Sequence, residues 1–120
     1  MEIKKWHVYL ADLNPRTFVS LSRTMGTEPG KVRPVVVVQT DLLNGLHPST
    51  VVCPLTTKVQ PRSRFLRVHL TIGEAGLKEQ SDIMVDQIRA IDNRRLLGHI
   101  GKISRKSQVK LDENLRILLT

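Results

Sequence analysis

The chain has 120 residues, 40% of them hydrophobic, which is enough apolar material for one core and too little length for a second domain. Its formal net charge of +8 favours a polyanionic partner such as nucleic acid over an acidic small molecule. Only 3% of the residues are aromatic, so RNA or DNA would have to be bound through its backbone, by arginine and polar groups, without a row of stacking rings.

The single cysteine and the terminal sequence indicate a cellular compartment. Cys53 alone cannot form an internal disulfide, and its apolar surroundings predict a buried structural thiol rather than a nucleophile. No apolar stretch approaches the roughly 20 residues of a membrane span, and Met1 to Lys5 lack the apolar region of a signal peptide. We therefore expect a cytoplasmic protein without a membrane segment.

The first half of the chain predicts two strands joined by a long loop. Residues 6–13 alternate in polarity as a strand does, and Asn14-Pro15 ends it. A loop from Arg16 to Lys31 follows, and it closes with a type II turn at residues 28–31, where Pro29 fixes φ and Gly30 accepts a positive φ.

The second predicted strand carries an arginine at its start. Pro34 holds the preceding Arg33 in an extended conformation, and residues 35–38 form an unbroken run of valines. Such a run predicts a strand buried on both faces, by the barrel interior and by a further cover such as a second subunit.

The following segments predict further short strands. Residues 50–57 form a third strand with Cys53 and Leu55 on the inner face and Thr56 facing outward. Residues 65–70 alternate, which turns Leu66, Val68 and Leu70 inward and Arg67 and His69 outward, in a hairpin that carries cations and no acid.

The last third predicts a turn, more short strands and one helix. Residues 73–76 allow one helical turn, residues 81–92 two short strands or one bent strand, and residues 98–103 a small strand. From Ser104 onward, leucines recur at helical spacing, and Asp112 and Arg116 form an exposed i,i+4 pair. About five to seven short strands and one terminal helix, without a βαβ pattern, predict a mainly β fold, a small antiparallel barrel spanning residues 1–120 as one domain.

Most familiar catalytic motifs are absent from the sequence. The four histidines are far apart and lack ligand spacing, so we expect no metal site and no cofactor. There is no Gly-x-Ser-x-Gly elbow and no phosphate-binding P-loop. The remaining candidates are Arg33 at the start of one strand and Thr56 at the end of another, which could bind one phosphate between them.

Four segments, in this order, resemble motifs of the MazF/PemK toxins of bacterial toxin–antitoxin systems. They are residues 8–15 (VYLADLNP), 26–39 (GTEPGKVRPVVVVQ), 49–56 (STVVCPLT) and 86–92 (DQIRAID). The resemblance implies an SH3-like barrel of the CcdB/PemK type and a symmetric homodimer. It also implies a metal-independent endoribonuclease that cleaves single-stranded RNA, and a cognate MazE-like antitoxin that blocks the RNA groove.

The resemblance also implies the site residues. The family's catalytic arginine and threonine fall on Arg33 and Thr56, and its acidic loop residue falls on Glu28. The residues expected to contact RNA lie in the loops around this pair: Arg16, Arg23, Thr27, Pro29, Gly30, Lys31, Gln39, Thr57, Lys58 and Gln87.

The chain departs from the family pattern in two places. Trp6-His7 stands where the family commonly has Gly-Asp, and residues 18–25 lengthen the first loop, where we expect a mobile flap at the mouth of the RNA groove. Two other functions remain open: a gyrase poison acting by protein contact on the same barrel, and a nucleic-acid-binding barrel without catalysis. The ending Ile117-Leu-Leu-Thr120 argues against the gyrase poison, whose family motif is a C-terminal Trp.

Overall fold

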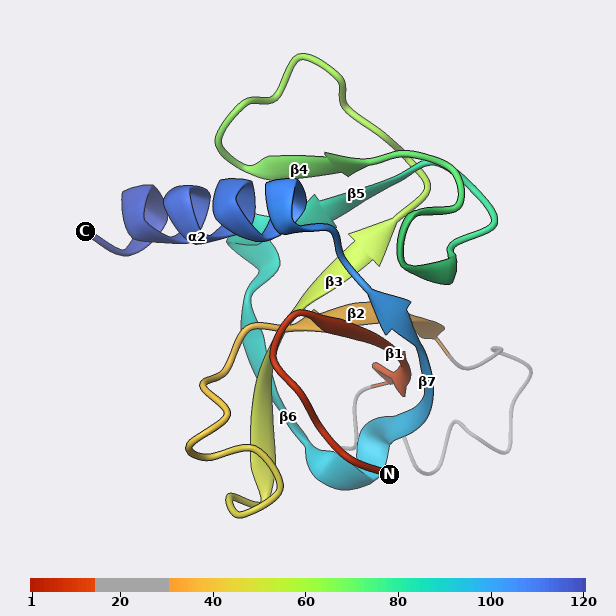
Figure 1. Ribbon diagram of the computed structural model, residues 1–120, viewed down its shortest axis with the longest axis vertical. Coiled ribbons are helices and arrows are strands. Elements are labelled where there is room, and N and C mark those ends of the chain that lie inside the picture. Colours follow the sequence, from red (N-terminus) through yellow and green to blue (C-terminus); the bar gives the residue numbers. More distant parts are fainter. Residues whose placement is uncertain (15–30) are drawn as a thin grey trace.

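A computed structural model describes residues 1–14 and 31–120 (Figure 1). In chain order the strands and the long helix are β1 (His7–Asp12), β2 (Val32–Val37), β3 (Ser49–Thr56), β4 (Arg67–Leu70), β5 (Ser81–Met84), β6 (Arg89–Asp92), β7 (Leu96–Lys102) and α2 (Arg105–Leu119). Short 3-10 turns lie at η1 (Glu74–Gly76), η2 (Val85–Gln87) and η3 (Asn93–Arg95). None of the helices in these residues is long and apolar enough to cross a membrane.

The strands form one antiparallel, seven-stranded sheet in the order β4-β5-β3-β2-β1-β7, with β6 paired to β3 outside this path. β3 is the central strand because it pairs with three others. Its first residues pair with β6, residues 52–54 pair with β2, and Leu55 and Thr56 pair with β5. β2 therefore loses its β3 partner two residues before Thr56, and this separation of strands forms the site described below.

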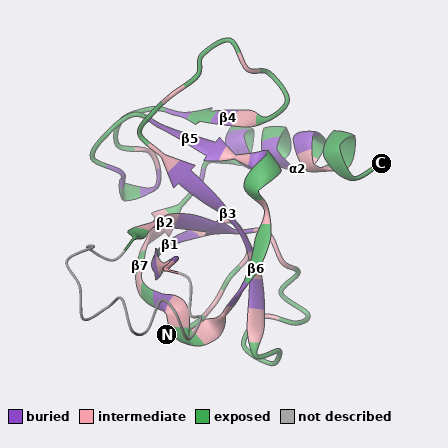
Figure 2. Ribbon diagram, turned by 180° about the vertical axis from the view of Figure 1, so that it is seen from behind, coloured by how far each residue is buried: buried purple, intermediate pink, exposed green. Residues whose placement is uncertain are grey.

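The valine run of β2 is buried on both faces by the chain itself. Because side chains alternate along a strand, Val36 packs in one core cluster with Val8 and Cys53, whereas Val35 and Val37 pack in a second cluster with Tyr9. Val35, Val36 and Val37 have no exposed surface in the single chain, and Figure 2 shows much of β2 in the colour of buried residues. Burial on both faces is confirmed, and both covers come from the chain itself, so this run gives no indication of a second subunit.

The C-terminal helix α2 packs beside β4 (Figure 1) and also contacts η2. Ser104 caps its start by accepting a hydrogen bond from the Ser107 N–H at 3.2 Å. Leu111 is fully buried, Leu115 packs against the same cluster, and Leu118 stays 39% exposed. The expected pair between Asp112 and Arg116 is present at 3.1 Å.

The elements predicted from the sequence are present, but the side chain of Leu66 is exposed and the last strand starts earlier than predicted. Residues 81–92 form two strands joined by η2, and the last strand begins at Leu96. Val68 and Leu70 are buried as expected, but Leu66 is 44% exposed, so its predicted inward orientation is wrong. Leu66 precedes β4, so the alternation of the strand does not extend to it. Residues 28–30 of the expected type II turn and the flap at residues 18–25 lie outside the described residues.

Trp6 occupies an unusual backbone conformation just before β1. Its φ is 72°, in the left-handed region that favours glycine. Hydrogen bonds hold it there, because its N–H donates to Val37 O at 2.8 Å and its carbonyl accepts from Ile103 N at 3.0 Å. The turn is therefore formed although the Gly of the family pattern is replaced by Trp.

Candidate active site

A pocket of about 460 Å³ opens where β2 and β3 separate. Beyond Val35 and Pro54, the last pair of the β2–β3 ladder, β2 continues alongside β1 and β3 continues alongside β5. The residues lining the pocket are Val32, Arg33, Pro34, Leu55, Thr56, Thr57, Lys58, Gln60, Arg67 and Met84.

Arg33 and Thr56 face each other across this opening. The ladder pairs Val35 with Pro54, and two residues further along each antiparallel strand the same register reaches Arg33 and Thr56. Because side chains alternate with a period of two, both project to the same side of the sheet. Both line the pocket and both are partly buried, which places a guanidinium and a hydroxyl where one phosphate could lie between them.

The hydroxyl of Thr56 is oriented by the chain that follows it. Its Oγ1 accepts a hydrogen bond from the backbone N–H of Lys58 at 3.2 Å. This contact occupies a lone pair and leaves the hydroxyl proton available for donation to a ligand oxygen. Arg33 has five N–H donors, and its side chain makes no hydrogen bond or ion pair with the residues the structure describes.

The ends of the first loop are held beside Arg33. Leu13 N donates to Lys31 O at 2.9 Å, and Lys31 N donates to the side chain of Asn14 at 2.9 Å. The guanidinium of Arg95 donates to the backbone carbonyl of Asp12 at 3.2 Å and so fixes the end of β1. These contacts place Asn14 and Lys31, the described residues on either side of the loop, close to the candidate site.

The structure brings together part of the predicted site. Arg33, Thr56, Thr57 and Lys58 line one pocket. Lys31 is two residues from Arg33 but lies outside the pocket lining, and Gln87 is exposed in η2 outside that lining. The positions of Arg16, Arg23, Thr27, Glu28, Pro29 and Gly30 lie outside the described residues.

Gln39 lies away from the pocket, and its predicted contact with RNA stays a prediction. It follows the far end of β2 from Arg33, where its side chain donates to Asn44 Oδ1 at 2.9 Å and accepts from Val51 N at 3.3 Å. These bonds tie the β2–β3 connection to β3. In this structure Gln39 therefore organises a turn at the opposite end of the strand from the pocket.

Sequence reasoning missed Arg67 as part of this site. It had placed Arg67 on the outer face of a hairpin without an acid, but the Arg67 Nη1 lies 3.2 Å from Oδ2 of the fully buried Asp82 on β5. Asp82 is also the cross-strand partner of Thr56. The sequence signal was an acid directly before the apolar residues Ile83 to Val85, because a buried carboxylate requires partner cations.

The pocket is strongly cationic. Arg33, Lys58 and Arg67 line it, and no acidic side chain from residues 1–14 and 31–120 does so. Such a site can bind a phosphodiester and stabilise negative charge that develops on its oxygens. In the same residues there is no group of three or more His, Cys, Asp or Glu side chains arranged to hold a metal ion.

Cys53 is excluded as a nucleophile at this site. It is fully buried in the core, and burial raises the pKa of its thiol to about 12. A thiol in this state is a poor source of the reactive thiolate.

Comparison with known proteins agrees with this geometry. Residues 4–119 match the family of PemK-like, MazF-like toxins of type II toxin–antitoxin systems. The chain is 34% identical to Endoribonuclease EndoA of Bacillus subtilis, over 99% of this chain and 96% of that protein. It is 32% identical to Endoribonuclease MazF of Staphylococcus epidermidis, over 98% of this chain and 91% of that protein.

Solved structures show the same fold. MazF from Deinococcus radiodurans superposes with a TM-score of 0.74 at 21% identity, covering 99% of this chain and 97% of that chain. A chain of a MazE-MazF crystal structure from the same organism gives 0.76 at 20% identity, with 99% and 96% covered. The antiparallel sheet with one C-terminal helix is thus the fold of the MazF toxins, and this chain belongs to the PemK-like, MazF-like toxin family of type II toxin–antitoxin systems.

Proposed function

We propose that this protein is a sequence-specific endoribonuclease toxin that cleaves single-stranded RNA at the pocket between β2 and β3. The observation that carries the proposal is the position of Arg33 and Thr56 on opposite walls of one cationic pocket. The names of the relatives, both endoribonucleases, support the choice of RNA as substrate.

The proposed reaction uses the nucleophile that RNA itself supplies. The ribose 2′-oxygen attacks the adjacent phosphorus, the bond from phosphorus to the 5′-oxygen breaks, and a 2′,3′-cyclic phosphate and a 5′-hydroxyl result. The 2′-hydroxyl loses a proton and the departing 5′-oxygen gains one, so no oxidant, reductant or added water is needed. No metal ion takes part in this scheme.

Arg33 and Thr56 act on the phosphoryl oxygens. The planar guanidinium of Arg33 can donate two parallel hydrogen bonds to them, and its charge favours the more anionic transition state. A guanidinium holds its proton tightly in water and is a poor proton donor, so we assign Arg33 an electrostatic role. Thr56 donates one hydrogen bond from the hydroxyl that Lys58 N orients. Glu28 is proposed as a base or as a contact to the ribose, and the roles of Arg33 and Thr56 do not depend on it.

The proposal extends to partners and location. A crystal structure of MazE-MazF, with a chain of the same fold, supports neutralisation by a MazE-like antitoxin. We also propose that the protein acts in the cytoplasm, as a homodimer of one-domain chains. Exposed apolar residues before β4 and at the end of α2 are candidates for contact with the second copy: Phe65, Leu66, Ile117 and Leu118. Light scattering at micromolar concentration should give twice the 13.6 kDa of one chain, and a monomer would contradict the dimer.

One experiment tests the reaction class. The purified protein is incubated with a long RNA in excess EDTA, and the fragment ends are sequenced and treated with a cyclic-phosphate-specific enzyme. We expect cuts at a short common sequence, with cyclic phosphate and 5′-hydroxyl ends. RNA binding without new ends, or cleavage that requires added Mg²⁺, would contradict the proposal.

A further inference from the structure

A second, smaller pocket adjoins the candidate active site. It measures about 190 Å³ and is lined by Pro61, Ser63, Arg64, Arg67, Val68, His69 and Lys110. Arg67 lines both pockets, so its side chain forms the wall between them. The second pocket therefore lies directly beside the site of the proposed reaction.

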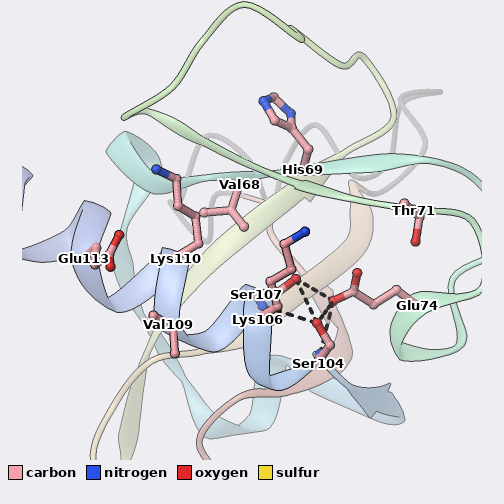
Figure 3. A pocket seen from close by; sticks show the side chains of 10 residues that line it. All are labelled: Val68, His69, Thr71, Glu74, Ser104, Lys106, Ser107, Val109, Lys110 and Glu113. Carbon is pink, nitrogen blue, oxygen red and sulfur yellow. Dashed lines mark hydrogen bonds between the residues drawn. The ribbon is translucent and has the colours of Figure 1, made fainter.

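The second pocket gathers basic side chains from three separate elements. Arg64 comes from the β3–β4 connection, Arg67 and His69 from β4, and Lys110 from α2. In Figure 3, Lys110 extends from the helix toward β4, and His69 projects from that strand. No acidic side chain from the described residues lines this pocket.

The carboxylate of Asp82 positions two side chains of this pocket and leaves the charges of Arg64 and Lys110 uncompensated. The fully buried Asp82 binds Arg67 Nη1 at 3.2 Å and His69 Nδ1 at 2.6 Å. Lys58 O accepts a second bond from the same Nη1 of Arg67 at 3.2 Å, which leaves the other guanidinium N–H groups available. Neither Arg64 nor Lys110 forms an ion pair within the part of the chain that the structure describes.

The connection that carries Arg64 is itself fixed. His69 Nε2 lies 3.1 Å from Ser63 O, Asn114 of α2 donates to Arg64 O at 3.2 Å, and Gln60 N donates to Asp82 at 2.7 Å. A basic pocket built on anchored backbone loses less conformational entropy on binding than one built on a free loop.

We propose that this pocket, between β4 and α2, is a second phosphate subsite that binds the RNA phosphate next to the one being cleaved. The inference rests on the proposed function, because the RNA strand must pass through the first pocket to reach the second. Arg64 and Lys110 contact the neighbouring phosphate, and Arg67 separates and orients the two phosphates. The RNA therefore leaves the active site across β4 toward α2.

A larger pocket of about 540 Å³ beyond Lys110 is a poorer phosphate site (Figure 3). Glu74 and Glu113 line it, and Glu74 accepts hydrogen bonds from Ser104 and from Ser107 at 2.6 Å. Two carboxylates there would repel a phosphate. The subsite is thus confined to the pocket lined by Arg64 and Lys110.

A chemical change in the RNA tests the subsite directly. The substrate is an oligonucleotide of the cleaved sequence with one ribonucleotide at the cut site, so that only one bond can be broken. Uncharged methylphosphonate linkages then replace the neighbouring phosphates one at a time. For the wild-type protein, replacing one adjacent phosphate should lower kcat/KM about three- to tenfold, the range for a partly exposed charged contact. The Arg64→Gln/Lys110→Gln variant should be insensitive to that same replacement.

A matched control and a binding assay test the phosphate subsite separately from the proposed cleavage reaction. Arg105→Gln also removes one charge from α2, but Arg105 is exposed and lies outside all three pockets described here. The salt dependence of single-stranded RNA binding should weaken by about 0.7 in log–log slope for Lys110→Gln and stay unchanged for Arg105→Gln. This assay needs no cleavage, so it judges the subsite even if the proposed reaction fails.

Three outcomes would overturn the subsite. One is an equal methylphosphonate effect in the wild type and the double variant. Another is a salt slope for Lys110→Gln that matches Arg105→Gln. The third is unchanged RNA kinetics together with weaker binding of an acidic peptide, which would assign this pocket to a protein partner instead.

Discussion

Oδ1 of Asp82 lies 2.6 Å from Nδ1 of His69, and Oδ2 of the same carboxylate accepts from Arg67 Nη1 and from Gln60 N. One buried acid on β5 thus holds two residues of β4 and one of the β3–β4 connection. Both cationic pockets depend on this contact, because Gln60 and Arg67 line the first and Arg67 and His69 line the second.

Replacing Asp82 by Asn should therefore destabilise the protein. The amide keeps the shape but presents an N–H₂ group where donors already converge, so we expect a loss of about 2 kcal/mol in the free energy of unfolding. Urea unfolding measures this loss. Asp112→Asn is the matched control, since its pair with Arg116 is exposed and should change stability by less than about 1 kcal/mol. Equal losses in the two variants would show that Asp82 does not organise this region.

Much of the fold could be predicted from the sequence because its signals are local. Pro34 followed by valines fixed the start of β2, and Ser104 with the recurring leucines fixed α2. The valine run did not indicate which part of the protein buries its second face. A run of valines predicts burial on both faces but contains no information on whether the cover comes from another part of the same chain or from another chain.

Arg33 and Thr56 could be predicted as site residues from the sequence. The role of Arg67 could not, because it depends on the pairing of two strands. Arg33 and Thr56 were placed from the resemblance and from their positions at strand ends. The role of Arg67 depends on Asp82, which lies 15 residues further along the chain and approaches it only through the pairing of β4 with β5. The exposure of Leu66 has the same origin, because β4 begins one residue after it.

The backbone at Trp6 gives a second prediction. Trp6 packs partly buried against the core cluster that contains Val8, so both Trp6→Gly and Trp6→Ala should lower stability by loss of that contact. The glycine variant should nevertheless be more stable than the alanine variant by about 1 kcal/mol, because only Ala bears the steric cost of a positive φ. Thermal or urea unfolding of the two variants checks the order. An alanine variant at least as stable as the glycine variant would mean that residue 6 changes its conformation.

The histidine pair beside β1 predicts a pH dependence of stability. Nδ1 of His7 lies 2.8 Å from Nε2 of His99, so one ring must accept the hydrogen bond. Burial lowers the pKa of His7 below 6.5, and the neighbouring His99 and Lys102 lower it further. The folded state then binds fewer protons than the unfolded state below about pH 6.5, so stability should fall as pH drops through this window.

The melting temperature of wild type and His7→Gln between pH 7.5 and 5.5 measures this effect. Wild type should lose more on acidification than the variant, since the variant lacks the titrating ring. His47→Gln is a suitable control because His47 is exposed and bonds locally to Ser49. Parallel pH profiles for wild type and His7→Gln would exclude His7 as the source.

The most direct test of the central claim is the single-turnover rate of RNA cleavage by Arg33→Ala, with Thr56→Val beside it. Losing the guanidinium should cost about 3–4 kcal/mol of transition-state stabilisation, comparable to an oxyanion donor, and losing one hydroxyl should cost less. Arg94→Ala is the control, because Arg94 is exposed and pairs with Asp92 away from the pocket. We predict a rate lowered by roughly 10²- to 10³-fold for Arg33→Ala in a protein that still folds, and an unchanged rate for Arg94→Ala. Near-normal cleavage by Arg33→Ala would contradict the assignment of this pocket as the active site.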